Sequence, residues 1–212
     1  MTEAEWDTCA DSRAMLDFLR ASGRLTARKA RLFAVACCRR HWHLLTDERS
    51  RQAVLIAERY ADWAATRREL RFAFSCAADA YAYAASGAGD ARAAAGAANA
   101  ARPEDDYYAA YVTPREDHPA LLRDLFGPLL FRPVRIEPAW LTWNSGTLRR
   151  LAEAIYNERS LPEGHLDTGK LAVLADAFED AGCDNADLLN HCRSEGPHVR
   201  GCWVVDLLLG KE

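Results

Sequence analysis

The chain has 212 residues, and its 27 basic and 31 acidic side chains give a formal net charge of -4. Hydrophobic residues make up 50% of it, but 40 of the 212 are Ala, so the average apolar side chain is small. This composition excludes a disordered acidic tail and a collagen-like fibre. It also excludes a bilayer-spanning helix, because no uncharged apolar stretch reaches 18 residues.

The first ten residues and the cysteines indicate the compartment. Residues 1–10 carry Glu3, Glu5 and Asp7 and lack a basic region followed by an apolar one, which argues against a secretory signal. We therefore expect a cytoplasmic protein. Seven cysteines are an odd number in a chain long enough to fold without disulfides, so we expect reduced thiols, metal ligands or small core residues.

Helical patterns dominate the first hundred residues. Thr2 with Glu5, and Thr66 with Glu69, are capping boxes that begin helices, and Thr46 is a further candidate cap. Apolar residues recurring every three or four positions predict helices over about residues 26–45, 47–64 and 66–84. Before them, Met15, Leu16, Phe18 and Leu19 form a short apolar cluster that ends at Gly23. The Ala- and Gly-rich stretch 84–101 predicts a helix that frays or breaks near Gly87, because Gly costs roughly 1 kcal/mol relative to Ala in a helix.

The second half combines an irregular segment with further helices. Residues 102–118 are typical of a polar loop, a short helix is predicted over 119–126, and the proline-rich segment 128–144 looks extended. Helices are predicted over 147–159, 170–181, 185–193 and 202–209. The fold class is therefore all-α, an irregular multi-helix bundle. We expect an N-terminal helical region (1–101), an aromatic connector packed on the core (102–146) and a C-terminal helical region (147–212), together forming one compact unit.

Three segments resemble known families. The segments Leu32-Phe-Ala-Val-Ala-Cys-Cys-Arg-Arg40 and His198-Val-Arg-Gly-Cys-Trp-Val-Val-Asp-Leu-Leu-Leu-Gly-Lys211 resemble an uncharacterised planctomycete-type family of bacterial paralogues. Leu174-Ala-Asp-Ala-Phe-Glu-Asp-Ala-Gly182 resembles the signature of a helical repeat-companion domain, with Ala177 in place of its Trp and Phe178 in place of its Leu. The resemblance implies kinship with a bacterial family that has no known activity.

Cysteines and histidines form the one metal-ligand pattern in the sequence. Cys37 and His41, and likewise His198 and Cys202, are four residues apart, the spacing of neighbours on one helix face. If the two pairs met, they would form a Cys2His2 set of the kind that holds structural zinc, with Cys192, His191 and Cys183 as substitutes. The alternative is that the cysteines pack as small hydrophobes and the histidines cap helices.

Aromatic residues in the irregular segment suggest a binding surface. Tyr107, Tyr108, Tyr111, Trp140 and Trp143 lie in or beside it, and aromatic side chains of that kind anchor protein interfaces. The alternative is that they pack the connector onto the core.

Three other groups of residues are weaker candidates for a functional site. A thiol enzyme would need Cys192 with His191 or His198 and an orienting Asp206 or Asn190. Arg39, Arg40, Arg67, Arg68 and Arg71 could line a nucleic-acid-binding side, but acidic residues are interspersed with the arginines throughout. Asp176, Glu179 and Asp180 are typical of a solvated helix face.

The sequence thus favours a non-catalytic module whose partner is another protein, without a membrane or nucleic-acid partner. No cofactor is expected for this favoured module. The first alternative is a protein with a zinc site built from Cys and His. The second is an Arg-mediated nucleic-acid binder.

Overall fold

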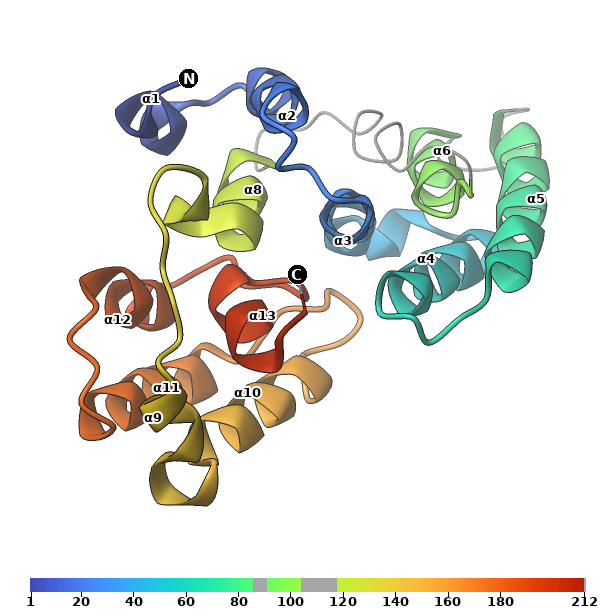
Figure 1. Ribbon diagram of the computed structural model, residues 1–212. Helices are drawn as coiled ribbons and strands as arrows, with labels where there is room; N and C mark the ends of the chain where they lie inside the picture. The colour runs from blue at the N-terminus through green and yellow to red at the C-terminus, as the bar shows by residue number, and fades with distance from the viewer. Residues whose placement is uncertain (86–90, 104–117, 212) are drawn as a thin grey trace. The chain divides into compact units, whose positions relative to one another are not determined.

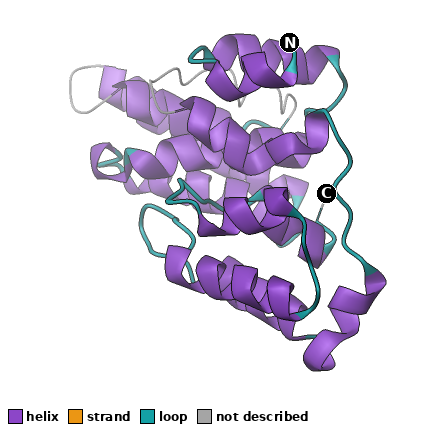
Figure 2. Cartoon of the chain, turned by 90° about the vertical axis from the view of Figure 1, so that its left-hand side faces the viewer, coloured by secondary structure: helices purple, strands orange, loops and turns teal. Residues whose placement is uncertain are grey.

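The protein is all-α, as predicted. The computed structural model describes residues 1–85, 91–103 and 118–211, and in them it contains twelve α-helices and a few short 3₁₀ helices. Figure 2 shows helices and loops, and no strand, in this described part of the chain. Two isolated bridges, between Ser160 and His165 and between His165 and Val199, are the β-type pairings found there. None of the described helices is long and apolar enough to cross a bilayer.

The chain contacts divide the protein into two units. Unit 1 comprises Met1 and Cys9–Pro119, and unit 2 comprises Thr2–Thr8 and Ala120–Glu212. We expected a single unit with a connector over 102–146. The observed boundary lies inside that connector, and the N-terminal helix joins the C-terminal part of the chain.

Unit 1 is built from five described α-helices, which Figure 1 labels. They are α2 (Ser12–Ala21), α3 (Ala27–Arg40), α4 (Glu48–Ala61), α5 (Arg67–Tyr83) and α6 (Ala91–Ala100). The capping box of Thr66 and Glu69 is confirmed at the start of α5. The cap of α4 is Asp47 rather than Thr46, because the Asp47 side chain accepts the amide N–H of Arg49.

Helix α3 is buried along most of its length, including its charged residues. Arg39 forms a two-point ion pair with Glu58 of α4, with nitrogen–oxygen distances of 3.2 and 2.7 Å. Arg31 donates to the carbonyl oxygens of Ala100 and Arg102, at the end of α6, over 2.6 and 3.0 Å. Both contacts give a buried arginine hydrogen-bond partners. These partners lower the free-energy cost of burying the two charges.

The Ala-rich tract forms the helix α6, as predicted for its second half. Ala97, Ala100 and Ala101 are completely buried in an apolar cluster with residues of α3, α4 and α5. Their small side chains allow close approach of helix backbones, so the tract contributes to the core. The break expected near Gly87 lies outside the described residues.

Unit 2 contains seven α-helices within its described residues. They are α1 (Glu3–Thr8), α8 (His118–Phe126, whose first two residues belong to unit 1), α9 (Pro138–Thr142), α10 (Thr147–Asn157), α11 (Thr168–Asp180), α12 (Ala186–Arg193) and α13 (Trp203–Leu209). The α10, α11, α12 and α13 helices share one apolar core, in which Leu174, Phe178 and Val204 are completely buried.

The segment 128–144 differs from the extended form expected. It contains two 3₁₀ helices, Gly127–Leu130 and Trp143–Ser145, and the α9 helix. Pro128 and Pro138 lie in the first turn of a helix, where the missing N–H of proline costs nothing. Two of the prolines that suggested extended chain therefore begin short helices, whereas residues 133–137 between them are in no helix.

Candidate metal centre

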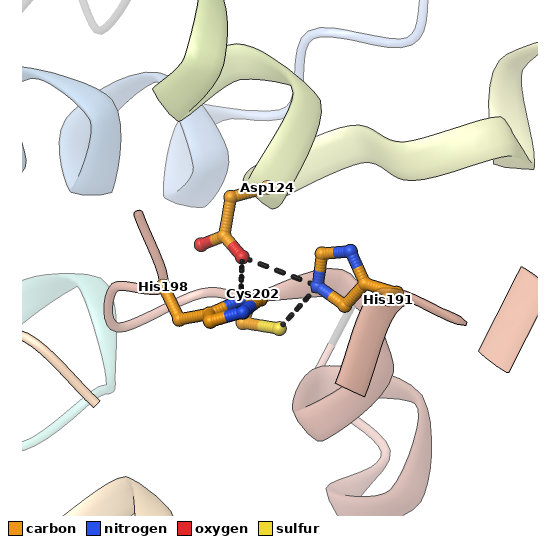
Figure 3. A group of neighbouring side chains, drawn as sticks. All are labelled: Asp124, His191, His198 and Cys202. Atoms are coloured by element: carbon orange, nitrogen blue, oxygen red, sulfur yellow. Dashed lines mark hydrogen bonds and ion pairs between the residues drawn. The ribbon is translucent and has the colours of Figure 1, made fainter. Parts of the chain in front are cut away.

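Four side chains of unit 2 converge on one point. They are Asp124 of α8, His191 of α12, His198 of the loop after α12, and Cys202, the N-cap residue of α13. Each offers one donor atom, and all four atoms lie within 4.8 Å of one another. Figure 3 shows these side chains pointing toward one another from different segments of the chain.

The position of Asp124 follows from how α8 is packed. Three leucines of α8 are completely buried: Leu121, Leu122 and Leu125. Asp124, the only acidic residue of α8, is 3% exposed and is therefore buried beside them. Gly127 ends α8 with a φ of +52°, and a Cβ there would lie 2.5 Å from the Trp203 indole. Glycine thus lets the end of α8 lie directly against the start of α13.

The loop between α12 and α13 is held by backbone hydrogen bonds. Leu166 donates its amide N–H to the His198 carbonyl oxygen over 2.9 Å. The next residue, Val199, donates its N–H to Oδ2 of Asp124, also over 2.9 Å. The loop therefore fixes His198 and also orients the carboxylate, whose other oxygen, Oδ1, faces the histidines.

The donor atoms approach one another closely. His198 Nδ1 is 2.9 Å from Asp124 Oδ1, and His191 Nε2 is 3.2 Å from the same oxygen and 3.1 Å from Cys202 Sγ. In a tetrahedral zinc site with bonds of 2.0–2.3 Å, donors are roughly 3.3–3.7 Å apart. These three contacts are shorter than that separation, while the four donor atoms as a group lie within 4.8 Å of one another, so the side chains would have to shift to hold the ion.

Both ring nitrogens of His198 face oxygen atoms, and Ser194 Oγ also lies 3.2 Å from Nε2. Nε2 lies 3.1 Å from the carbonyl oxygen of Ser194, which can only accept a proton. A neutral His198 that donates there has a lone pair on Nδ1, which faces the carboxylate oxygen of Asp124. Two acceptors at this distance need a proton or a cation between them. The second nitrogen of metal-bound histidine is commonly held in this way by a carbonyl.

Without a metal, the contact between His198 and Asp124 shifts the pKa of both groups. Burial acts to raise the pKa of Asp124, but hydrogen bonds and charge from His191 and His198 outweigh it and lower that pKa to about 2. Burial acts to lower the pKa of His198, and its contacts with Asp124 raise it overall. Burial also raises the pKa of Cys202 well above its ordinary value, so this thiol stays protonated without a metal.

A small pocket of about 170 Å³ opens beside the cluster. Asp124, His191 and His198 line it, whereas Cys202 does not. The remaining lining residues are Ala120, Arg123, Ser194, Gly196 and Pro197. His191, whose side chain is 16% exposed, is the most accessible of the four candidate ligands, so an ion would reach the cluster past this histidine.

The structure brings together only part of the ligand set expected from sequence. His198 and Cys202 are in the cluster, and His191 joins them as one of the substitutes. Cys37 and His41 belong to unit 1, where His41 Nδ1 lies 3.1 Å from the Cys37 carbonyl oxygen at the end of α3. His41 therefore has the helix-capping role that was the alternative to metal binding. Cys183 and Cys192 are buried in the apolar core of unit 2.

Asp124 is the ligand that sequence reasoning missed. A usable signal was present, because Asp124 is three residues after Leu121 and so shares its helix face within the predicted 119–126 helix. An acid on the apolar face of a short helix needs a buried partner. The pattern of Cys and His pairs at helical spacing does not include a carboxylate ligand.

The aromatic surface expected from sequence is not formed by its tryptophans. Trp140 is buried and contacts Phe178 edge to face, with ring centroids 5.9 Å apart, and Trp143 packs partly buried against the same core. These two residues therefore follow the alternative, in which the connector packs on the core. Tyr107, Tyr108 and Tyr111 lie outside the described residues.

Three members of the charged groups form ion pairs within the protein. Arg39, one of the arginines considered for nucleic-acid binding, is buried against Glu58. Asp176 and Glu179 both pair with Arg193 on the surface of unit 2.

Comparisons with family models, with curated protein sequences and with solved structures found no match to this chain. The resemblance to planctomycete-type paralogues and to the repeat-companion domain therefore stays a prediction. The function has to be argued from the cluster itself.

Proposed function

We propose that this protein binds one zinc ion in unit 2, with Asp124, His191, His198 and Cys202 as its four ligands. The observation that carries the proposal is the convergence of four donor atoms within 4.8 Å from separate segments of the chain. The approach of His198 Nδ1 to 2.9 Å from Asp124 Oδ1 supports it, because both atoms are of types that bind zinc. The single carboxylate oxygen shared by both histidines supports it further.

Zinc suits this donor set better than the other common metals. Calcium and magnesium prefer sites made entirely of oxygen atoms, and copper(I) and iron–sulfur clusters prefer sites richer in thiolate. Zinc accepts imidazole nitrogen, thiolate and carboxylate oxygen together, and four protein ligands are typical of a structural site. The carboxylate and the thiolate would also balance its two positive charges.

The ion would join three parts of unit 2 that are distant in sequence. Asp124 precedes His191 by 67 residues along the chain, and Cys202 follows His191 by 11. Binding to the folded state alone stabilises that state, and for structural zinc the binding energy becomes folding energy. The protein-binding role favoured by the sequence stays a prediction, since an interaction module is compatible with such a site.

The test is the zinc content of the purified full-length protein, measured by elemental analysis after dialysis against zinc and then against buffer. We expect one zinc per chain in the wild type. We expect a large loss of zinc affinity, ten- to a hundredfold or more, in Cys202→Ser and in Asp124→Asn, since each removes a ligand charge.

Two variants in unit 1 serve as controls. The double variant Cys37→Ser, His41→Gln removes the pair predicted from sequence, and Cys76→Ser removes a half-buried thiol of α5. Both should keep one zinc per chain. A wild-type protein that holds no zinc after this loading would refute the proposal. Loss of zinc in the Cys37, His41 variant would contradict the assignment of the site to the four residues of unit 2.

A further inference from the structure

Helix α5 of unit 1 carries aromatic side chains on an exposed face. One side of this helix contacts α4 and α6, and Leu70, Ala77 and Ala80 are completely buried there. On the other side Phe72 is 73% exposed and Tyr83 is 59% exposed. A single exposed aromatic residue is ordinary, but these two lie on one side of one helix, about three turns apart, which is typical of an interaction surface.

The exposed face is a stripe that runs along most of α5. Its members follow one another at helical spacing and are exposed, apart from one half-buried cysteine: Arg68, Phe72, Ser75, Cys76, Asp79 and Tyr83. Arg71, also exposed, lies at the edge of the stripe. The small side chains of Ser75 and Cys76 lie at its centre, where they allow a second helix to approach closely.

The charges on this face have a direction. Arg68 and Arg71 lie in its first half, and Asp79 lies in its second half. Arg49 of α4 lies near Asp79, and its pKa is raised first by hydrogen bonds to Asp47 and further by the charge of Asp79. Arg49 forms its ion pair with Asp47, so the exposed carboxylate of Asp79 can accept a cation from another chain.

A face that is basic at one end and acidic at the other is complementary to a copy of itself turned end for end. In that arrangement each basic end meets an acidic end, and the same contacts occur twice, as a twofold interface requires. A parallel copy would place Asp79 beside Asp79 and the arginines beside one another. The charges therefore select a second copy of this chain in the antiparallel orientation.

We propose that the exposed face of α5 binds a second copy of the chain, with the two α5 helices antiparallel and a twofold axis between Ser75 and Cys76. In this register Arg71 of each copy lies level with Asp79 of the other. Each Phe72 inserts between Ser75, Cys76 and Asp79 of the other copy, as a knob fits into a hole in packed helices. A single pair of helices buries less area than a standard interface, so the dimer should be weak, of micromolar affinity or below.

The first test is sedimentation of the full-length protein over a range of concentrations. We expect a reversible equilibrium between monomer and dimer, and a monomer at every concentration up to about 1 mM would refute the proposal. Phe72→Glu should weaken the association at least tenfold. Val173→Glu is the matched control, because Val173 is an exposed apolar residue of α11 in unit 2, and it should associate like the wild type.

Charge reversal tests the register. Arg71→Asp and Asp79→Arg each place like charges together and should each weaken the association, whereas the double variant restores opposite charges and should recover it. Circular dichroism shows whether each variant is folded. A folded double variant that associates no better than the single variants would overturn the register.

Crosslinking with a short bismaleimide tests the orientation. In a Cys9→Ser background Cys76 is the remaining half-buried thiol, and its two copies lie on either side of the twofold axis, so the reagent should join two chains. Moving the thiol along the helix with Cys76→Ser and Ala82→Cys would place the two sulfur atoms roughly 20 Å apart and should abolish the crosslink. Crosslinking at both positions would indicate parallel helices and overturn the proposal, as would a dimer that does not crosslink at Cys76.

This proposal does not depend on the zinc site, because none of the four proposed ligands lies in α5. Sedimentation with and without chelator should therefore give the same association constant. Dimerisation that disappears with the chelator would place the interface in unit 2 and refute the assignment to α5.

Discussion

The buried pair of Asp124 and His198 gives the metal-free protein a defined pH dependence. The pKa of Asp124 is lowered in the folded state, so its contribution is present above its ordinary pKa of about 4 and is lost as the pH falls toward 2. The pKa of His198 is raised, so its contribution is complete below about 6.5 and is lost as the pH rises through the folded value. The pair therefore stabilises the fold most between about pH 4 and 6.5.

We expect the free energy of unfolding of the metal-free protein to decrease from pH 5.5 to pH 8.5. With zinc bound the direction should reverse, because the ligands must be deprotonated and zinc affinity rises with pH. Urea denaturation at both pH values, with chelator and with zinc, measures this. The decrease should be smaller in His198→Gln, and an equal decrease in that variant would contradict the assignment to this pair.

A second prediction at the residue scale concerns the ion pair of Arg39 and Glu58 in unit 1. Both side chains are 3% exposed, so replacing Arg39 by Met leaves the carboxylate of Glu58 buried without its partner. We expect Arg39→Met to lower the free energy of unfolding by about 3–5 kcal/mol. The double variant with Glu58→Leu should recover much of that loss, because an apolar pair of similar size has no charge to desolvate.

Urea denaturation compares these variants with a surface pair. Arg149 and Glu153, one turn apart on α10, are well exposed, and Arg149→Met should cost less than about 1 kcal/mol. If Arg39→Met cost no more than this control, the buried pair would not contribute as its geometry indicates.

At the scale of elements, the contact between the end of α8 and the start of α13 depends on Gly127. Its φ is +52°, and an added Cβ would lie 2.5 Å from the Trp203 indole. We expect Gly127→Ala to destabilise the protein by about 2–4 kcal/mol, since a strained backbone and overpacking against a buried ring both contribute. It should also weaken zinc binding, because the same contact positions Asp124.

Gly182, which follows α11, separates the two effects. Its φ of +86° is also positive, but no atom lies within 4 Å of an added Cβ. Gly182→Ala should therefore show only the backbone cost, about 1 kcal/mol, and unchanged zinc affinity. Thermal denaturation and zinc titration of both variants make the comparison, and equal effects would argue against the steric role of Trp203.

At the scale of the whole molecule, the metal should matter to one unit more than to the other. All four proposed ligands belong to unit 2, so removing zinc should raise amide hydrogen exchange in α8, α12 and α13. The helices of unit 1, α3 to α6, have their own apolar core and buried ion pairs and should keep their protection.

Hydrogen exchange with mass-spectrometric detection of peptides, with and without chelator, tests this. The control is Cys202→Ser, which should show the pattern of the chelated wild type whether or not zinc is added. Loss of protection spread equally over α3 to α6 would show that the metal supports the whole chain rather than unit 2.

The predictable part of this protein was its helices. Cap residues such as Thr66 with Glu69, and apolar positions repeated every three or four residues, determine each helix through contacts a few residues apart. Even the Ala-rich tract followed its local propensity and formed α6. Such features need no knowledge of the fold, because the atoms involved are neighbours along the chain.

The set of side chains that form the site depends instead on contacts between segments far apart in the chain, which no local sequence pattern contains. Spacing suggested that Cys37 and His41 would meet His198 and Cys202, but His41 caps its own helix. Asp124 and His191 complete the cluster because α8, α12 and α13 pack together, with Gly127 allowing the approach to Trp203. The sequence by itself determined most of the helices and suggested Cys and His, but not the carboxylate, as metal ligands. Only the tertiary structure decided which of those side chains meet, because burial and packing join residues that are 67 positions apart.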